Sequence, residues 1–489
     1  MPDDSSGTDQ VLPHRYADLA QRLESQIHSG GLRAGDRLPS VRELAGQFQC
    51  SISTALRAYE HLEALGLIGS RPRSGYYVQA QAATRELPQA IALPQSQPSL
   101  ISSDLVSTVI DTVSRPGLMP LSYATPAPEF LPAASLNRIT RNLIKQQPAQ
   151  ALSYLMSPGL ERLRQQIAAR MNAAGVEAAA EDIVITNGAL EAINLCVRML
   201  TRPGDTLLME SPTYYSLLQV AEEHGLRVVE VANDPTRGVD PEEVRRLVRR
   251  HRIDAALLAQ NFNNPTGSLM PDAAKRELVQ ILGSAGIPLI EDDVYGELGF
   301  NGQRATPLKS FDTDDRVLYC SSFSKTLSPG MRLGWVLSRR HRRELARRKF
   351  TASCAAASLP QLLVSRYLDG GGYERHLRGM RSALARSVAR FADVVLREFP
   401  AGTSVTRPQG GFVLWVQLPD RIDAMELFAQ AAQGGIAISP GTLFSAAGQY
   451  QHHIRLNCAL PWTPKLEQAL CSLGWLAARM LRKSAAAGA

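Results

Sequence analysis

Residues 321–334 read Ser-Ser-Phe-Ser-Lys-Thr-Leu-Ser-Pro-Gly-Met-Arg-Leu-Gly and follow an apolar run that starts at Val317. Lys325 therefore comes directly after a strand-like segment and lies among small hydroxyl residues, which is a poor setting for a solvated surface charge. A lysine amine can form an imine with an aldehyde cofactor, and Arg332 can hold an anionic group of that cofactor. The stretch predicts a cofactor site at the end of a strand.

Strand-like and helical patterns alternate along the chain that leads to this stretch. Apolar runs predict strands at 183–186, 206–209, 227–231, 255–259, 288–291 and 317–320, and helical patterns lie between them, for example at 189–200, 215–224 and 272–285. This alternation predicts an α/β fold with a mostly parallel sheet and helices on both faces. After about residue 340, long helices and a few strands (412–416, 453–457) predict a smaller α+β domain.

The N-terminal segment has a different pattern. Apolar residues at helical spacing predict a first helix over 16–29. Ser40 followed by Glu43 predicts a capping box that opens a second helix. A third helix is expected over 51–65, and the alternation over 67–78 predicts a hairpin. Three helices and a hairpin are typical of a winged helix-turn-helix, which binds DNA.

The composition changes between these parts. Residues 79–102 are rich in Gln, Ala, Pro and Ser, which is typical of a linker. The expected organisation is a winged helix-turn-helix at 12–78, a linker at 79–115, a large cofactor-binding domain at 116–340 and a small C-terminal domain at 341–489.

The overall composition narrows the class of protein. The chain has 489 residues, a hydrophobic content of 44% and a net charge of +7, so two or three globular domains are expected. No run of about 18 apolar residues marks a membrane span. Its polar, acidic first residues do not resemble a signal peptide. The 6 cysteines lie far apart without metal-ligand spacing. We expect a cytoplasmic protein with no membrane segment and no metal site.

The strongest basic run, at 339–349, lies outside the winged-helix segment. Such a run is most often a solvated helix face. The alternative is a second contact with DNA phosphates.

Polar residues follow several of the predicted strands, and ligands of doubly wound sheets bind at the carboxyl ends of strands. Gly188 opens a helix, where backbone N–H groups can bind phosphate. Tyr214 could stack on an aromatic ring, and Asn264 before Pro265 could turn its amide toward a ligand. Each of these three also has an ordinary explanation in packing or loop structure.

A run of three carboxylates, 291–293, ends another predicted strand. Burying them without partners is costly, which favours a positively charged target. Asp292 could pair with a protonated pyridine nitrogen, and Tyr295 could donate to a ring oxygen. Together with Lys325 and Arg332, these residue types match what pyridoxal phosphate (PLP) requires.

Longer motifs support this prediction. In the N-terminal segment they are Leu38-Pro-Ser-Val-Arg-Glu-Leu-Ala45 and Ser70-Arg-Pro-Arg-Ser-Gly-Tyr-Tyr-Val78; farther along they are Tyr154…Pro158-Gly159…Leu163-Arg164, Asn264-Pro-Thr-Gly267, Asp292…Tyr295 and Ser322…Ser324-Lys325…Arg332. Residues 120–480 resemble the fold-type I aminotransferases of the aspartate aminotransferase superfamily. The N-terminus resembles the GntR winged helix, and the fusion resembles the MocR subfamily of GntR regulators.

The resemblance implies a role for each matching residue. Lys325 would form the internal aldimine with PLP, Asp292 would pair with the pyridine nitrogen, and Arg455 would clamp the α-carboxylate of a ligand. The other implied contacts are Asn264 and Tyr295 with the phenolic oxygen, Tyr214 with the ring, Gly188, Ala189, Leu190, Ser322, Ser324 and Arg332 with the phosphate, and Tyr154 with the phosphate of the other protomer of a homodimer.

The same resemblance implies contacts with double-stranded DNA. The expected residues are Arg42, Ser51, Ser53, Thr54 and Arg57 on the helices and Arg71 and Arg73 on the wing. Many GntR proteins carry an arginine directly after the first serine of the recognition helix, where this chain has Ile52. Direct reading of the major groove at that position is therefore in question.

The implied function is that of a PLP-dependent transcriptional regulator. An amine or amino acid would replace Lys325 on the cofactor, form an external aldimine and alter DNA binding. The alternative is an active amino-acid aminotransferase with an accessory DNA-binding domain, because Lys325, Asp292 and Arg455 are all retained. A structural relic of an aminotransferase is less consistent with that retention.

Overall fold

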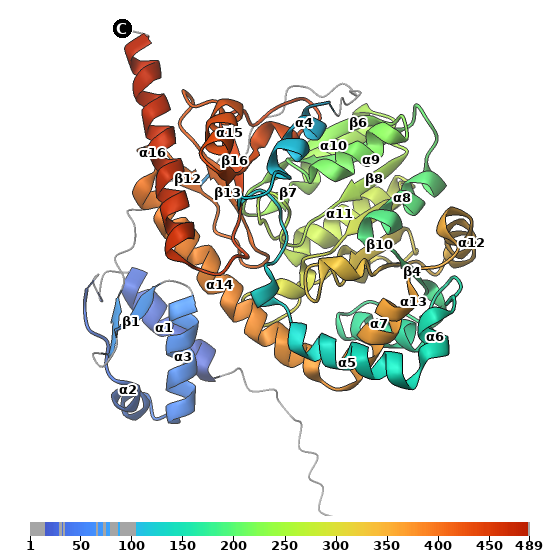
Figure 1. The fold of residues 1–489 in the computed structure, drawn as a ribbon, viewed down its shortest axis with the longest axis horizontal. Helices are drawn as coiled ribbons and strands as arrows, with labels where there is room; N and C mark the ends of the chain where they lie inside the picture. Colours follow the sequence, from blue (N-terminus) through green and yellow to red (C-terminus); the bar gives the residue numbers. More distant parts are fainter. Residues whose placement is uncertain are drawn as a thin grey trace, which may run out of the picture. The chain divides into compact units, whose positions relative to one another are not determined.

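The computed structural model describes residues 15–28, 32, 35–64, 67–71, 75–78, 87–88 and 104–487. The chain divides into two compact units, Met1–Arg85 and Glu86–Ala489. Each unit is described by itself below, and Figure 1 shows their elements.

The first unit has the predicted winged helix-turn-helix. Its elements are α1 (Arg15–His28), α2 (Val41–Gln47), α3 (Ile52–Ala64), β1 (Ile68–Arg71) and β2 (Gly75–Val78). The capping box is confirmed, because the Glu43 N–H donates to the Ser40 side chain and the Ser40 N–H donates to the Glu43 carboxylate. β1 and β2 pair antiparallel as the predicted hairpin.

Tyr59 of α3 contacts both the segment before α2 and the hairpin. Its side chain is fully buried, and its hydroxyl donates to the Pro39 carbonyl at 2.7 Å, just before α2. Its ring centroid lies 4.6 Å from that of Tyr76 on the hairpin. Because one side chain contacts α2 and the wing, α3 is held in a fixed orientation toward both.

The second unit contains the predicted, mostly parallel sheet. The strand order is β4 (Ile183–Thr186), β11 (Gly334–Leu337), β10 (Val317–Ser322), β9 (Leu289–Asp292), β8 (Ala255–Leu258), β5 (Thr206–Ser211), β6 (Arg227–Asp234) and β7 (Gly238–Val239). The strands from β10 to β6 run parallel, whereas β11 is antiparallel to both of its neighbours and β7 is antiparallel to β6.

Helices cover both faces of this sheet, as predicted (Figure 1). Leu207 and Met209 of β5 pack in one core with α8 (Ala189–Leu200) and α9 (Tyr215–Glu223). Leu208, between them, packs on the opposite face with α10 (Pro241–Arg250) and α11 (Asp272–Ser284). The alternation arises because successive strand residues point to opposite faces.

The remaining helices complete the unit. Beside β4 and β11 the sheet is covered by α5 (Ala133–Gln146), α7 (Glu161–Ala173) and α13 (Ser358–Asp369), with α6 (Pro148–Leu152) next to α5 and α13 and with α12 (Arg342–Ser353) against β4 and α8. Among the helices described in residues 15–487, none is long and apolar enough to cross a membrane.

A second sheet forms the core of the C-terminal part. Its order is β12 (Ser404–Val405), β13 (Val413–Gln417), β16 (His453–Asn457) and β15 (Ser439–Pro440). It packs with α14 (Gly372–Glu398), α15 (Ala424–Gln433) and α16 (Pro464–Ala487).

The expected linker end at 115 is wrong. Residues Asp104–Val113 form helix α4, and Val106, Val109 and Val113 are buried in the core of the C-terminal part. The following strand β3 (Met119–Pro120) pairs in parallel with β14 (Ile436–Ala437). Burial of this apolar helix face outweighs the polar composition upstream. Most of the expected linker, at 79–86 and 89–103, lies outside the described residues.

The expected boundary at 340 also differs from the packing. Leu345 of α12 belongs to the core on the α8 face of the large sheet. Leu362 and Val364 of α13 share a core with Ile183 of β4. Helices α12 and α13 therefore pack with the large sheet, because their apolar side chains are buried against its end strands.

Candidate cofactor and ligand site

The strand register brings the predicted cofactor residues to one edge of the large sheet. Cys320 of β10 lies opposite Asp292 of β9. Two residues later, Ser322 lies opposite Gly334 of β11, which in turn lies opposite Thr186 of β4. The carboxyl ends of β9, β10 and β4 therefore meet, which is where a doubly wound sheet binds ligands.

Two glycines and Arg332 form a close-packed cradle at the start of α8. Gly188 has a φ of +86° and precedes the first helical residue, Ala189. A Cβ on Gly188 would lie 2.6 Å from Nη2 of Arg332, and one on Gly334 would lie 2.5 Å from the carbonyl carbon of Gly188. The Nη2 of Arg332 donates to the Asn187 carbonyl at 3.2 Å. A helix N-terminus beside a guanidinium is suited to a phosphate.

Ser322 and Ser324 join this cradle to the lysine turn. Both are nearly buried, and the Ser324 N–H donates to the Ser322 hydroxyl at 3.3 Å. Ala189 and Leu190 occupy the first turn of α8, whose leading N–H groups have no partner within a helix.

The three adjacent carboxylates have different environments. Glu291 accepts from the N–H groups of Leu308 and Lys309 at 2.7 and 2.9 Å. Asp293 accepts from Arg304 at 3.0 Å and from the Tyr319 hydroxyl at 2.9 Å. In contrast, Oδ1 of Asp292 is buried and has no hydrogen-bond partner among the described residues.

This difference identifies Asp292 as the carboxylate available to a ligand. Burial, followed by the charge of Asp293, raises its pKa to about 7, while Lys325 opposes the shift. A cationic group beside Asp292 would favour the ionised form. The protonated pyridine nitrogen of PLP fits this requirement.

Tyr295 also has an unused polar atom at the site. Its hydroxyl is buried without a partner in the described part of the chain, and its ring lies edge-on to Phe412 at 5.4 Å. The Nζ of Lys325 lies 5.8 Å from the Tyr295 ring centroid. A ring oxygen placed between lysine and tyrosine would satisfy this hydroxyl.

Lys325 loses its proton more readily than a solvated lysine. Its Nζ donates to the Ala124 carbonyl at 2.8 Å. Burial, followed by the charges of Arg455 and Arg332, lowers its pKa to about 8, although Asp292 acts in the opposite direction. The uncharged amine needed for imine formation is therefore far more abundant than in a solvated lysine.

Arg455 reaches the site from β16 of the C-terminal part. It is 1% exposed, and its guanidinium donates to Oδ1 of Asn264 at 2.9 Å, to the Ser439 hydroxyl at 3.1 Å and to the Ser122 carbonyl. Its Nε has no partner among the residues described. These acceptors are neutral, so a ligand carboxylate could compete for the guanidinium.

Two features of the site were missed in the sequence. The first is Glu210, which accepts from Thr213 and Asn263 and so holds the loop that carries Asn264. Burial raises its pKa to about 8. The second is the segment 122–124, whose carbonyls accept from Arg455 and Lys325. Backbone carbonyls leave no signal in a sequence motif.

Two predicted tyrosines have different positions. Tyr214 precedes α9, and its ring centroid lies 4.7 Å from that of Tyr215. Burial is the main cause that raises the pKa of Tyr295, and the nearby Tyr214 hydroxyl adds to the shift. Tyr154 follows α6 and is 77% exposed. Within the described part of one chain, Tyr154 makes no recorded contact with the site.

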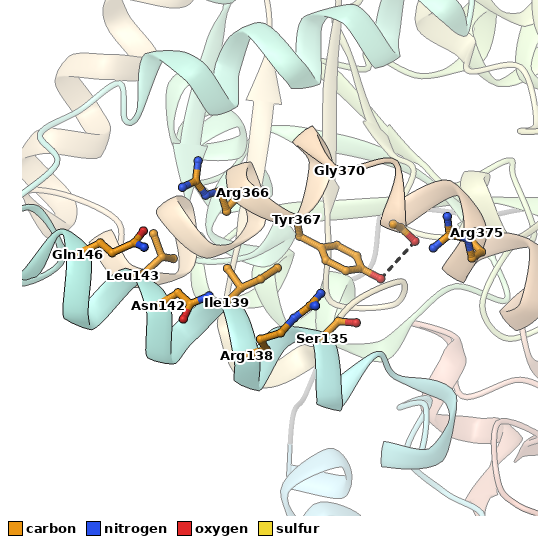
Figure 2. A pocket seen from close by; sticks show the side chains of 11 residues that line it. Ser135, Arg138, Ile139, Asn142, Leu143, Gln146, Arg366, Tyr367, Gly370 and Arg375 are labelled. Atoms are coloured by element: carbon orange, nitrogen blue, oxygen red, sulfur yellow. Dashed lines mark hydrogen bonds between the residues drawn. The ribbon is translucent and has the colours of Figure 1, made fainter.

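A separate cavity of about 410 Å³ lies between α5, α13 and the start of α14 (Figure 2). Arg138, Arg366 and Arg375 line it, and the Tyr367 hydroxyl donates to the Gly372 carbonyl at 3.3 Å at its wall. No residue predicted for cofactor or ligand binding lines this cavity. Its arginines are solvent-exposed, so it contains no buried charge that requires an anion.

The predicted DNA contacts lie on the first unit. Arg42, Ser53 and Arg57 are exposed, while Thr54 is half-buried. The Ser51 hydroxyl accepts from the Thr54 N–H at 3.1 Å and bonds the hydroxyls of Ser53 and Thr54, so it caps α3. Arg73 and the side chain of Arg71 lie outside the described residues.

The basic run at 339–349 is partly neutralised within the second unit. Arg339 pairs with Glu177 at 2.7 Å, Arg347 and Arg348 pair with Glu344, and the buried Lys349 pairs with Glu191. These carboxylates reduce the charge available for DNA phosphates, which favours the solvated-face interpretation of the run.

Comparison with known families matches both units. Residues 15–78 match the family of bacterial regulatory proteins of the gntR type, and residues 129–473 match the class I and II aminotransferases. The regulator YjiR of Escherichia coli, described as an uncharacterized HTH-type transcriptional regulator, is 35% identical over 94% of this chain and 98% of its own length. The chain belongs to the MocR subfamily of GntR regulators.

Other relatives of this MocR-type regulator lack the N-terminal match. The 2-aminoadipate transaminase of Thermus thermophilus is 29% identical over 73% of this chain and 90% of its own. The crystal structure of LysN, an alpha-aminoadipate aminotransferase of that organism complexed with N-(5'-phosphopyridoxyl)-L-leucine, has a TM-score of 0.72 at 27% identity and covers 78% of this chain and 96% of its own.

These comparisons and the geometry agree on the cofactor and the general function. The regulator has a PLP-binding aminotransferase domain fused to a DNA-binding domain, and it acts in transcription. The unused atoms of Asp292 and Tyr295, the glycine cradle and the Lys325 amine are the kinds of group that PLP requires.

Proposed function

We propose that an amine ligand with a carboxylate, such as an amino acid, binds at Lys325 and Arg455 and changes how this regulator binds DNA in the cytoplasm. One observation carries the proposal. Lys325 donates to the Ala124 carbonyl, and Arg455 donates to the Ser122 carbonyl, so both ligand-binding groups hold one short segment. That segment follows α4 and β3, the first elements described in the second unit.

The two hydrogen bonds would respond differently to a ligand. When bound, PLP supplies an aldehyde carbon that bonds to a primary amine, either that of Lys325 or that of a ligand. Lys325 can donate to Ala124 only when its amine is free. Arg455 would turn from the neutral acceptors Ser122 and Asn264 toward a ligand carboxylate, because a bidentate ionic pair is stronger.

The proposed consequence is a change in the position of segment 122–124 and of the strand and helix before it. Ser122 also bonds Ser439 of β15, so the segment is attached to the C-terminal sheet as well as to the site. A ligand with different affinities for the two arrangements would shift their populations.

The direct test follows DNA binding during ligand titration. The purified PLP-bound protein is titrated with a panel of amino acids while its absorbance and its affinity for a selected duplex are recorded. We expect one class of carboxylate-bearing amine to change both together. In Lys325→Ala the spectral response and the change in DNA affinity should be lost, while DNA binding itself remains. A ligand that changes the spectrum without changing DNA affinity would refute the proposal.

A homodimer is part of the proposal. Leu152, Tyr154 and Met156 expose three large apolar side chains within five residues. Exposed patches of this kind mark interaction surfaces. Tyr154 would then reach the phosphate site of the second copy. Analytical ultracentrifugation of Leu152→Asp should show monomers and weaker PLP binding, whereas an unchanged dimer would contradict this assignment.

The retained chemistry also supports an active aminotransferase as a second candidate. A free Lys325 amine with a pKa of about 8 can take up and return a proton beside a bound ligand. Formation of keto acid over many turnovers, without an effect of the same amino acid on DNA affinity, would favour this second function.

A further inference from the structure

Two large apolar side chains on the recognition helix are not used by the fold. Ile52 is 56% exposed and Leu56 is 38% exposed, whereas Ala55, Ala58 and Tyr59 of the same helix are fully buried. Residues four positions apart lie on one face of a helix. Ile52 and Leu56 therefore form an apolar strip beside the core-facing side of α3.

The surroundings of this strip point to a nucleic acid as its partner. Ser53 and Arg57 form a polar strip next to it and are exposed, as is Arg42 on α2. The hydroxyl of Ser51 caps the helix, so α3 starts rigidly at Ile52. In a helix-turn-helix, the N-terminal residues of the second motif helix contact base edges in the major groove.

The major groove offers one apolar group to such a strip. Each A·T pair presents the C5 methyl of thymine, whereas G·C pairs present only donors and acceptors. Isoleucine and leucine have no hydrogen-bond donor for guanine. A G·C pair in contact with them would therefore lose the hydrogen bonds that its major-groove edge makes to water. A thymine methyl would instead gain apolar contact.

We propose that Ile52 and Leu56 read thymine methyl groups and make A·T pairs the preferred bases at the centre of each half-site. The rise between the two residues is about 6 Å along the helix. The rise of DNA is about 3.4 Å per base pair. The two side chains therefore match methyl groups about two base steps apart.

The experiment removes single methyl groups from the DNA. A binding duplex is selected from a random pool with the purified full-length protein, and each thymine is then replaced in turn by deoxyuridine. Affinity is measured by fluorescence anisotropy at one fixed salt concentration. We expect about a fourfold loss at each of one or two thymines per half-site and no loss elsewhere, since burial of a methyl group contributes about this factor.

Matched protein variants assign the effect to the residues. Ile52→Ala should bind the thymine and deoxyuridine duplexes equally at one position, and Leu56→Ala should do so at the other. Gln47→Ala, at an exposed position at the end of α2, should keep the full discrimination at both. A duplex with 5-methylcytosine·guanine in place of a sensitive T·A pair should bind better than one with unmethylated C·G, except to the alanine variant that has lost discrimination at that position.

Three results would overturn the inference. The first is the absence of any methyl-dependent position. The second is discrimination at every sensitive position in both alanine variants, and the third is a selected duplex with G·C pairs at all central positions. A change in oligomeric state of Ile52→Ala with unchanged DNA affinity would instead identify the strip as a protein contact. None of these results depends on whether an amino acid regulates the protein.

Discussion

Asp292 illustrates what is decided at the scale of single residues. It is one of three adjacent carboxylates, and only its Oδ1 lacks a hydrogen bond among the described residues. Its neighbours Glu291 and Asp293 are fully engaged with backbone N–H groups and with Arg304. The chemistry of the site thus depends on which carboxylate is left without a partner.

A matched pair of variants separates these roles. Asp292→Asn should weaken PLP binding at least tenfold, because the ionic partner of the pyridine nitrogen is lost, and leave the stability of the cofactor-free protein nearly unchanged. Asp293→Asn should lower the free energy of unfolding by about 3 kcal/mol, because it removes one of the two carboxylates that pair with the buried Arg304. Absorbance titration and denaturant unfolding measure the two effects. Equal loss of stability in both variants would contradict the distinction.

The Lys325 amine makes the second residue-scale prediction. Its pKa is lowered to about 8 in the folded protein. The uncharged fraction of Lys325 should therefore rise about tenfold per pH unit below pH 8 and level off above pH 8. A lysine with the ordinary pKa would level off only above about pH 10. The rate of PLP association, measured by stopped-flow absorbance, should follow this profile. A rate that keeps rising steadily up to about pH 10 would disprove the lowered pKa.

At the scale of elements, the start of α8 depends on backbone geometry. The left-handed φ of Gly188 and its close approach to Arg332 leave no space for a side chain. Gly334 of β11 also lies close to the backbone of Gly188 and leaves no space for a side chain. The cradle predicted for the phosphate is therefore formed by three elements that approach one another without intervening side chains.

A glycine pair tests this geometry. Gly188→Ala should displace Arg332, reduce PLP affinity by tenfold or more, and destabilise the fold by about 1–3 kcal/mol. Gly204→Ala has a similar φ of +91° but open space around the new Cβ, so it should cost stability without weakening PLP binding. Comparison of PLP titrations for the two variants isolates the clash from the backbone strain. Similar PLP affinities would refute the cradle.

Much of this element-scale structure was predictable. The spacing of apolar residues located β4, α8 and β16 with their observed bounds, because each is a strongly periodic segment. Helix α4 was missed because it is short and follows a Pro- and Ser-rich stretch. Its place in the fold depends on the packing of Val106 and Val109 in the core of the C-terminal part, which is a contact between distant parts of the chain.

At the scale of the whole molecule, the proposed regulation depends on α4. This helix connects segment 122–124 to the region that precedes it, and Val109 anchors it in the C-terminal core. Sequence analysis predicted Lys325 for the cofactor and Arg455 for the ligand but gave no indication that both hold the same segment. That information lies in backbone carbonyls.

Loosening this anchor should uncouple ligand binding from DNA binding. Val109→Ala should leave ligand affinity within about twofold but reduce the ligand-induced change in DNA affinity severalfold, because α4 no longer follows the segment. Val244→Ala in α10 is the control. Val244 is also buried, but in a different core from α4, so the loss of packing is similar. Calorimetry and anisotropy give the two affinities. Equal coupling in the two variants would show that α4 does not transmit the signal.

The pairing of β3 with β14 has a consequence for the order of events during synthesis. Ser122 and Ser439 are separated by 317 residues in sequence, yet they bond directly beside Arg455. At translation rates of about 5–20 residues per second, roughly 15–60 s pass between the emergence of one and that of the other. The DNA-binding unit has its complete core much earlier. All residues of the DNA-binding core are therefore synthesised before the ligand site can be completed.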